Sequence, residues 1–266
     1  MITSFSNPRI KSVMQLQSKA KARKEQDAFV VEGVKMFLEA PIERIREVYF
    51  SESFLHAEAE NANVRNKIKE LEATGIPYES VSEEVFKKLS DTVTPQGVLL
   101  VCKAYHYSLR DLLTKENPLL LIVEDIQDPG NLGTMIRTGE GAGIDGIIMT
   151  KETADLYNPK VIRSTMGSVY RVPFVVTDDL IGVLSKLRES GITTYAAHLK
   201  GTKSYDAFDY RKGCAFLIGN EGNGLKKETA DAADSYMRIP MQGRVESLNA
   251  GIAAAVLMYE AARQRR

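Results

Sequence analysis

The sequence has few of the features that mark membrane or exported proteins. Among its 266 residues, no apolar run approaches the 18 residues that a membrane-spanning helix needs. The N-terminus lacks a continuous apolar stretch of the kind found in export signals. These absences argue against membrane insertion and export, and we expect a cytoplasmic protein.

The scarcity of cysteine and histidine excludes two kinds of site. Cys102 and Cys214 lie in apolar, strand-like segments, which favours buried free thiols over a disulfide. His56, His106 and His198 lie far apart in the sequence, and none has metal-ligand spacing with a cysteine. We therefore predict no metal site.

Neither sign of charge is in excess, since 35 lysines and arginines balance 35 aspartates and glutamates. The distribution is uneven, however, because residues 1–24 contain six basic residues and no acid, and the chain ends Arg-Gln-Arg-Arg. A basic segment on a neutral body predicts local contact with phosphates, although solvated termini give the same pattern. We expect residues 1–28 to form a basic arm that carries Arg9, Lys11 and Arg23.

The rest of the chain divides into two α/β segments joined by a connector. Residues 29–103 alternate short strand and helix patterns and predict a small α/β domain. Residues 104–118 lack a strong period and predict a linker with one helical turn. In residues 119–266 the alternation is stronger and predicts a mostly parallel sheet with helices on both faces. The expected strands of this sheet are LLLIVED, GIIMT, VPFVVT, ITTYAAH, CAFLIGN and YMRIP.

The last predicted helix is small or apolar on nearly every side from Ala250 to Ala262. A helix that is apolar all round is expected to be buried all round. The sheet of its own chain can cover one side only. We therefore predict a homodimer in which a second subunit covers the other side.

One glycine cluster imitates a nucleotide-binding motif. The stretch GAGIDG, from Gly141 to Gly146, satisfies G-x-G-x-x-G. The dinucleotide motif follows a strand and opens a helix, because the pyrophosphate binds the helix N-terminus. Here a helix precedes the glycines and a strand follows them, which favours a helix end and turn. A Rossmann-type enzyme would need this cluster to bind NAD.

Three other segments are better candidates for a site. Residues 124–138, 217–225 and 239–251 each leave an apolar strand, pass through Gly or Pro, and carry polar groups. Loops that follow parallel strands gather on one edge of the sheet, where ligands bind. No P-loop, nucleophile elbow or Ser-His-Asp set is present in the sequence. The side chains that would meet at this edge are Asn131, Arg137, Glu221, Ser247 and Asn249.

At these segments the chain resembles the SpoU/TrmH-type RNA ribose methyltransferases of the SPOUT superfamily. Three family motifs occur in order: DPGNLG with a downstream Arg137, IGNEGNGL, and IPMQG followed by Ser-Leu-Asn. The resemblance covers about residues 119–263. Residues 29–103, which end in TPQGV before the last strand, look like the small RNA-substrate-binding domain of the family.

The resemblance implies a fold and a cofactor that the residues alone do not give. Knots are rare in proteins, but this family threads its C-terminal segment through a loop to form a trefoil knot. The same bends would hold S-adenosylmethionine. The implied cofactor-binding residues are Leu217, Gly219, Asn220, Gly222, Ile239, Met241, Leu248 and Asn249.

The resemblance also implies a reaction, the methylation of a ribose 2′-hydroxyl. The family gives proton handling to the arginine that matches Arg137, but arginine is normally never deprotonated in proteins. Arg137 could instead clamp the adjacent phosphate or stabilise the developing alkoxide. Glu221 would pair with or orient an arginine, while the remaining catalytic candidates, Asn131, Ser247 and Asn249, would fix geometry.

The implied substrate is RNA. Arg9, Lys11, Arg23, Arg137 and Arg163 are the candidate RNA-binding residues. The ribosomal-protein type of the first domain and the basic N-terminus favour ribosomal RNA over transfer RNA. Two alternatives stay open, a transfer-RNA 2′-O-methyltransferase and a non-catalytic RNA-binding protein of the same fold.

Overall fold

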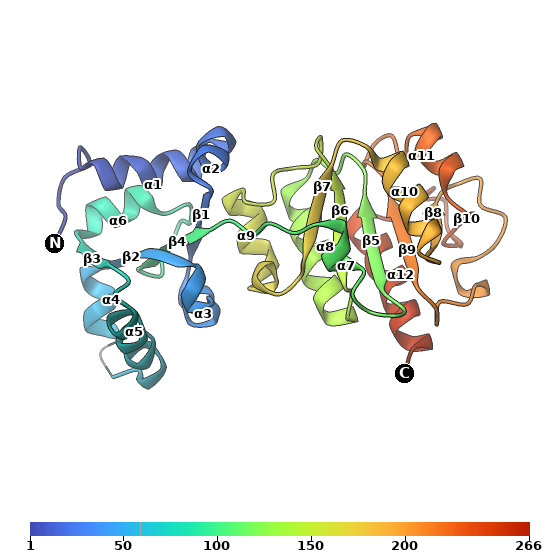
Figure 1. Cartoon of the computed structure of the whole chain (residues 1–266). Coiled ribbons are helices and arrows are strands. Elements are labelled where there is room, and N and C mark those ends of the chain that lie inside the picture. The colour runs from blue at the N-terminus through green and yellow to red at the C-terminus, as the bar shows by residue number, and fades with distance from the viewer. Residues whose placement is uncertain (59) are drawn as a thin grey trace. The chain divides into compact units, whose positions relative to one another are not determined.

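The computed structural model describes residues 1–58 and 60–266 and divides into two compact units (Figure 1). The first unit contains Met1–Tyr105 and Asp155–Tyr170, and the second contains His106–Ala154 and Arg171–Arg266. The first break lies close to the boundary expected after residue 103. The sequence analysis did not foresee that residues 155–170 belong to the first unit.

The first unit is built on a four-stranded sheet in the order β1-β4-β2-β3. Strand β4 is antiparallel to both β1 and β2, and β3 is parallel to β2. The strands are β1 (Ala28–Glu32), β2 (Ile45–Ser51), β3 (Tyr78–Val81) and β4 (Val98–Lys103). Its central helices are α3 (Val34–Glu39), α4 (Glu52–Ala57), α5 (Ala62–Thr74) and α6 (Glu83–Leu89), with the 3-10 turn η1 at Ile42–Arg44.

The basic N-terminal segment is helical, which corrects the expected arm. Helices α1 (Pro8–Ser18) and α2 (Ala20–Gln26) cover it. The side chains of Ile10, Val13 and Leu16 are at most 1% exposed and belong to the core of the first unit. Their spacing of three residues places them on one helical face, so burial of that face fixes the segment on the sheet.

The segment that returns to the first unit carries α9 (Pro159–Thr165) and the 3-10 turn η2 (Ser168–Tyr170). Helix α9 packs against β1, and the Tyr157 ring stacks on Phe29 with ring centroids 4.4 Å apart. The Tyr170 hydroxyl donates to the carbonyl of Met36 at 3.1 Å. Aromatic and polar contacts therefore join this segment to β1 and α3.

The second unit contains a six-stranded sheet in the order β10-β8-β9-β5-β6-β7, in which every neighbouring pair is parallel. This confirms the predicted parallel sheet. The strands are β5 (Leu119–Val123), β6 (Gly146–Thr150), β7 (Phe174–Thr177), β8 (Thr193–Ala197), β9 (Cys214–Ile218) and β10 (Ser235–Met237). The central strands β5, β6 and β9 are buried along their whole length, as continuous apolar runs predict.

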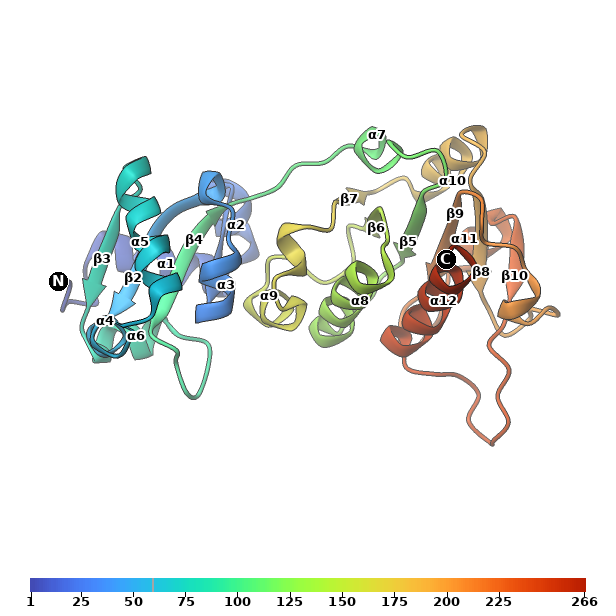
Figure 2. The same ribbon diagram turned by 90° about the horizontal axis from the view of Figure 1, so that it is seen from below.

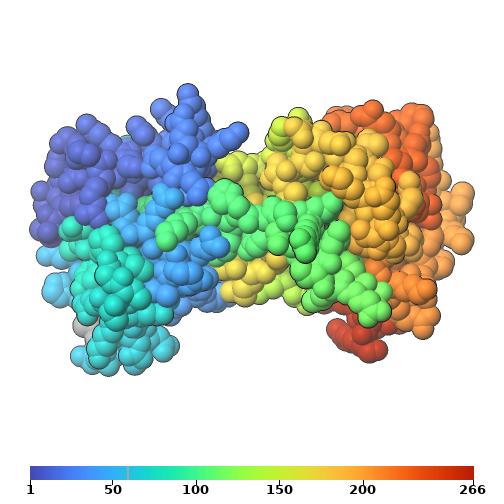
Figure 3. Space-filling view, viewed as in Figure 1, coloured from blue at the N-terminus to red at the C-terminus, as the bar shows by residue number. Residues whose placement is uncertain are grey.

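Helices cover both faces of this sheet (Figure 2). Helix α12 (Ala250–Gln264) packs against α8 (Pro129–Ala142) and strands β5 and β9. On the opposite face lie α7 (Leu109–Leu112), α10 (Leu180–Glu189) and α11 (Lys227–Ala232), with the 3-10 turn η3 at Tyr205–Ala207 elsewhere in the unit. In the space-filling view, side chains of α7 and α10 hide the strands beneath them (Figure 3).

The linker expected at residues 104–118 contains the single helical turn that its sequence suggests, as α7. The turn is not a free connector, because Leu112 is 1% exposed and lies in the core under the second sheet. The GAGIDG stretch ends α8, with Gly143 at φ +78° as its C-cap, so the turn interpretation is confirmed. Within the described residues, no helix is both long and apolar enough to cross a membrane.

Candidate active site

The loops after β5 and β9 lie side by side because the two strands are parallel neighbours. The Glu124 N–H donates to the carbonyl of Ile218 at 2.9 Å, so the pairing continues past the strand ends. Residues 219–225, called the glycine loop below, follow β9, and residues 124–131 follow β5. The predicted meeting of the first and second motifs at one sheet edge is therefore found.

The glycine loop is closed on itself. A Cβ on Gly219 would lie 2.1 Å from the backbone carbon of Gly224, so only glycine fits. Gly224 has φ +69° and donates its N–H to the carbonyl of Asn220 at 2.8 Å. The Asn220 Oδ1 accepts from the N–H groups of Gly222 and Asn223 at 3.0 and 3.1 Å. Glycine is therefore needed at Gly219 because another part of the backbone lies close, and at Gly224 because φ is positive.

Glu221 bridges the glycine loop to the loop after β5. One carboxylate oxygen accepts from the Asp128 N–H and from Asn131 Nδ2, each at 3.0 Å, and the other accepts from the Gln127 N–H at 3.0 Å. Burial opposes its ionisation, but these hydrogen bonds outweigh burial and lower the pKa of Glu221 below its ordinary value. Within the described part of the chain Glu221 contacts no arginine, so the arginine partner expected from the sequence is replaced by amides.

The side chains of Glu221, Asn131 and Asn249 form a continuous chain, called the amide chain below. Asn131 donates its Nδ2 to Glu221 and accepts at Oδ1 from Asn249 Nδ2 at 2.9 Å. Asn249 Oδ1 in turn accepts from the N–H groups of Gly251 and Ile252, which caps α12. One residue from each of the three motifs is therefore locked to the next.

Two acids at the end of β5 were missed by the sequence analysis. Glu124 is 2% exposed and accepts from the Lys226 N–H at 2.7 Å and from Thr229 Oγ1 at 2.5 Å. Asp125 has φ +57°, accepts at its carbonyl from Asn220 Nδ2, and pairs with Lys226 Nζ at 2.9 Å. Burial opposes ionisation of Asp125, but the bonds from Lys226 and Thr150 together with the Lys226 charge outweigh burial and lower the pKa of Asp125. Two acids directly after a fully apolar strand were the available signal.

Arg137 and Ser247 stand outside the amide chain. Arg137 is exposed on α8, six residues beyond Asn131 and so roughly 9 Å further along the helix. Ser247 is exposed in the loop before α12. Neither side chain makes an ion pair or hydrogen bond within the residues that the structure describes. Both are therefore open to a ligand.

The predicted cofactor residues lie at the ends of β9 and β10 and before α12. Leu217 is fully buried in β9, whereas Ile239, Met241 and Leu248 are half-buried in the loop segment. Hydrogen bonds within the glycine loop and to Asp125 use the whole Asn220 amide, which argues for a structural role. The full set is Leu217, Gly219, Asn220, Gly222, Ile239, Met241, Leu248 and Asn249.

The N-terminal basic residues lie in different surroundings. Arg9 is held by Glu47 and Glu79 at 2.9 Å each. Burial lowers the pKa of the Arg9 guanidinium, but the interactions with Glu47 and Tyr49 outweigh burial and raise it. Lys11 is exposed, with no ion pair among the described residues. Of this pair, only Lys11 is fully available to a phosphate.

Arg23 and Arg163 are both paired within the first unit. Arg23 is 6% exposed and pairs with Asp155 at 2.6 Å, while it also donates to the Leu16 carbonyl. This burial removes Arg23 from the RNA-contacting surface. Arg163 pairs with Asp91 at 2.9 Å but keeps about half of its side chain exposed. The N-terminal segment therefore uses part of its basic charge to hold its own fold.

Two family models match the chain. The SpoU rRNA Methylase family matches residues 118–259 and so includes all three motifs. The MRM3-like substrate binding domain matches residues 7–100, which form most of the first unit. The two matches leave little of the chain uncovered.

Known proteins match over nearly the full length. The 23S rRNA (guanosine(2553)-2′-O)-methyltransferase RlmP of Bacillus subtilis is 32% identical over 260 residues, or 97% of both chains. The crystal structure of an AdoMet-bound rRNA methyltransferase from Sinorhizobium meliloti has a TM-score of 0.86 at 32% identity, covering 98% and 97% of the two chains. A TrmH/SpoU tRNA modifying enzyme from A. aeolicus matches with a TM-score of 0.51 at 26% identity, covering 59% of this chain and 80% of that one.

Replacing Gly219 by alanine should destabilise the second unit. The added Cβ meets backbone atoms that cannot rotate away, and we expect a loss of about 3 kcal/mol in unfolding free energy. Gly222→Ala is the matched control, since its nearest atom is Asn220 Oδ1 at 3.6 Å. Chemical denaturation measures both. Equal stability of the two variants would contradict the close-approach explanation.

Replacing Glu221 by glutamine should weaken the bridge in a pH-dependent way. The amide NH₂ would face a backbone N–H, and we expect a loss of about 1 kcal/mol at neutral pH because the group is exposed. The pKa of Glu221 is lower in the folded protein than its ordinary value of 4.5. Ionised Glu221 therefore contributes its full stabilisation above about pH 4.5, and this contribution is lost as the pH falls through the lower pKa of the folded state. Denaturation at pH 7 and in acid should show the difference between wild type and variant shrinking. A pH-independent difference would contradict this account.

Proposed function

Because the chain belongs to the SpoU rRNA methylase family, we propose that it transfers a methyl group from S-adenosylmethionine to a ribose 2′-hydroxyl of RNA. The observation that carries the proposal is the amide chain, which ties one residue of each motif to the others. A fold kept only for binding RNA has no evident need for this arrangement at the sheet edge.

The residues at the ends of β8, β9 and β10 fit the proposed cofactor. The His198 N–H donates to the Met237 carbonyl at 2.9 Å, which keeps the loops after β8 and β10 together. The side chains expected around the nucleoside, such as Leu217 and Ile239, are apolar, so backbone groups would recognise a flat heterocycle. The ionised carboxylate of Glu221 at the same edge, which has no cationic partner among the described residues, favours a cation such as a sulfonium.

The chain's own residues supply alignment and charge. Bound S-adenosylmethionine would supply a methyl group on a sulfur whose positive charge already makes it a good leaving group. The amide chain holds Asn131 in one orientation, and alignment of reacting groups can lower a barrier by roughly 7–11 kcal/mol. Arg137 is exposed and unpaired within the described residues, so it can bind the adjacent phosphate or the developing alkoxide. We assign the hydroxyl proton to solvent, since arginine does not deprotonate.

Ribosomal RNA is the proposed substrate. Two relatives that match at least 97% of this chain are named for ribosomal RNA, and a third, which matches 99% of it, is named for transfer or ribosomal RNA. A transfer-RNA enzyme matches only 59% of this chain. A transfer-RNA methyltransferase and a non-catalytic RNA-binding protein remain the alternatives. A role on ribosomal RNA also supports the cytoplasm as the proposed location.

A trefoil knot remains part of this proposal. Family membership supports it, and so does the position of α12, whose first turn is held to Asn131 while its length lies on β5 and β9. The glycine loop lies against residues 124–131 in the same region. These contacts are those that a threaded C-terminal segment would need.

We further propose a homodimer through the outer face of α12. The inner residues of this helix, such as Ala254 and Met258, are fully buried, but Ile252 and Tyr259 are 50% and 46% exposed. With Ala255 and Val256, the open residues follow the spacing of one helical face. An apolar stripe that the chain leaves uncovered supports the second subunit that the sequence predicts.

Replacing Arg137 by alanine should abolish most methyl transfer while cofactor binding survives. We expect incorporation of labelled methyl groups into ribosomal RNA to fall at least about 100-fold, the scale of losing one transition-state contact. Arg211→Ala is the control, because Arg211 is an exposed arginine paired with Asp209 away from the motifs. Calorimetry with S-adenosylmethionine separates the alternatives. Unchanged turnover removes Arg137 from the mechanism, and no cofactor binding at millimolar concentration favours the non-catalytic protein.

Replacing Ile252 by aspartate should break the dimer. A charge in the apolar stripe would be desolvated without a partner, so we expect the dimer dissociation constant to rise at least about tenfold. Light scattering at micromolar concentration should give twice 29.5 kDa for the wild type and a lower mass for the variant. Ile181→Asp on α10 is the matched control, since Ile181 is 41% exposed. A monomeric wild type would refute the dimer.

A further inference from the structure

The loop between α6 and β4 presents an apolar side chain almost completely to solvent. This segment, residues 90–97, is called the tip loop below. Val93 in the tip loop is 97% exposed, the largest exposed fraction among the large apolar residues that the structure describes. A single exposed valine is ordinary, so any role for Val93 has to be argued from the way the loop holds it. The anchoring decides what this side chain can do.

The first half of the tip loop is anchored on Glu32. The Glu32 carboxylate accepts from Ser90 Oγ at 2.7 Å, from Thr92 Oγ1 at 2.9 Å and from the Asp91 N–H at 3.2 Å. Three bonds to one carboxylate fix the residues directly before Val93. Charged acceptors make the stronger hydrogen bonds, so this anchor is firm.

The second half is anchored on the start of α3 and the end of β2. Gln96 Oε1 accepts from the Val34 N–H at 2.9 Å, and it lies only 2.9 Å from the position that a Cβ on Gly33 would take. Gly97 has φ +79° and its carbonyl accepts from the Ser51 N–H at 2.8 Å. Both ends of the tip loop are therefore held, and Val93 is presented from a fixed frame.

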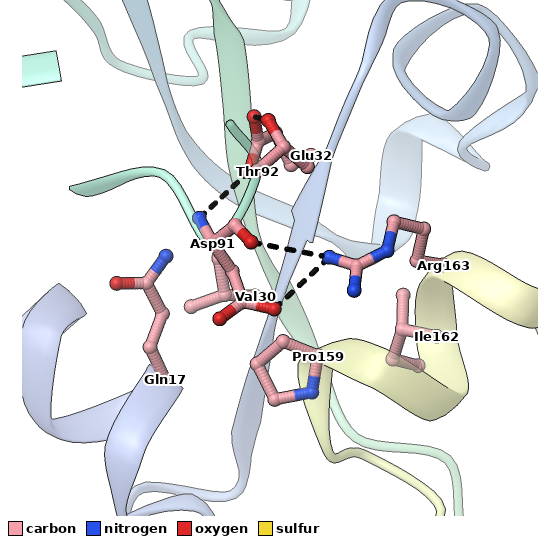
Figure 4. Close-up of a pocket in the computed structure, with 8 residues that line it drawn as sticks. All are labelled: Gln17, Val30, Glu32, Asp91, Thr92, Pro159, Ile162 and Arg163. Carbon is pink, nitrogen blue, oxygen red and sulfur yellow. Dashed lines mark hydrogen bonds and ion pairs between the residues drawn. The ribbon is translucent and has the colours of Figure 1, made fainter. Parts of the chain in front are cut away.

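The surroundings of the tip loop favour an anionic partner. Lys87 and Lys88 are exposed at the end of α6, immediately before the loop. Arg163 on α9 pairs with Asp91 (Figure 4), and about half of the Arg163 side chain stays exposed. The cavity beside this pair has a volume of about 30 Å³, which admits water but no nucleotide. Recognition must therefore take place on the protruding surface.

We propose that the tip loop is the RNA-reading element of the first unit and that Val93 packs against an unstacked base. The proposal rests on the proposed function, and the substrate-domain match over residues 7–100 includes this loop. The major groove of an RNA duplex is too narrow for such a loop, whereas bases in loops and bulges present faces to apolar side chains. Lys87, Lys88 and Arg163 lie where flanking phosphates would be neutralised. The substrate class is thus RNA with an unpaired nucleotide.

The direct test compares three variants in binding and kinetics. Val93→Ser should weaken binding of unmodified, transcribed large-subunit ribosomal RNA roughly tenfold, the scale of losing one buried valine contact. Val93→Asp should weaken it further by repulsion. The Michaelis constant for RNA should rise while kcat and S-adenosylmethionine affinity stay unchanged. Ile181→Ser, which changes an exposed aliphatic residue on α10, should leave RNA affinity, the Michaelis constant, kcat and S-adenosylmethionine affinity unchanged. Wild-type RNA affinity in both Val93 variants would overturn the proposal.

A second test asks whether RNA binding depends on the anchored position of Val93 or only on its apolar character. Glu32→Gln keeps Val93 but removes the charge that holds Ser90 and Thr92, so RNA affinity should fall by a factor of a few. A fully paired RNA duplex should compete poorly with ribosomal RNA for binding to the wild type. The affinity of the duplex should be the same for the wild type and for Val93→Ser. A duplex that competes as well as ribosomal RNA would overturn the unstacked-base assignment.

The outcomes also distinguish this inference from the proposed enzymatic function. If the wild type transfers no methyl group yet loses RNA affinity on Val93 substitution, the reading element stands and the enzyme does not. If methyl transfer proceeds with an unchanged Michaelis constant in the Val93 variants, the enzyme stands and the reading element does not. Capture of a protein at Val93 without any loss of RNA binding would refute the choice of RNA as partner.

Discussion

The site depends on one carboxylate that collects three N–H donors from a distant loop. Glu221 takes two backbone amides, from Gln127 and Asp128, together with the Asn131 side chain. Backbone donors at a helix start need acceptors in any case, since the first turn has no internal partners for them. A charged acceptor from another loop meets this need and fixes the distance between two motifs. Through the amide chain, Asn131 also holds Asn249 and with it the start of α12.

The sheet order makes this arrangement possible. Strand β9 lies between β5 and β8, although β5 is far from both of these strands in the sequence. Parallel pairing brings the ends of β5 and β9 level, so the acids after β5 reach the segment after β9. Glu124 accepts a hydrogen bond from the residue before α11, and the Asp125 carbonyl accepts one from the glycine loop. In the other direction, Glu221 of the glycine loop accepts from the loop after β5. Opposing anchors of this kind restrict both loops through hydrogen bonds.

The features that could be predicted from the sequence are those in which a local backbone or burial requirement selects one type of residue. The glycines after β9, the apolar strands and the helix end at Gly143 could be predicted because close approach, double burial and positive φ each leave a clear signature. Prediction failed where long-range contacts decide. The basic N-terminus looks mobile by charge, yet burial of one helical face outweighs the charge, and Arg23 finds a partner 132 residues away. The partner of Glu221 was misjudged for the same reason, because backbone amides do not appear in a sequence as candidates.

The return of residues 155–170 to the first unit affects how the protein is made. A ribosome delivers the chain in order, so residues 1–105 emerge well before the segment that stacks Tyr157 on Phe29. Until residues 106–170 have been made, the surface of β1 that α9 later covers stays open to solvent. The first unit therefore cannot complete its fold before part of the second unit has been made. A chain that ends between residues 105 and 155 has a first unit in which α9 does not cover β1.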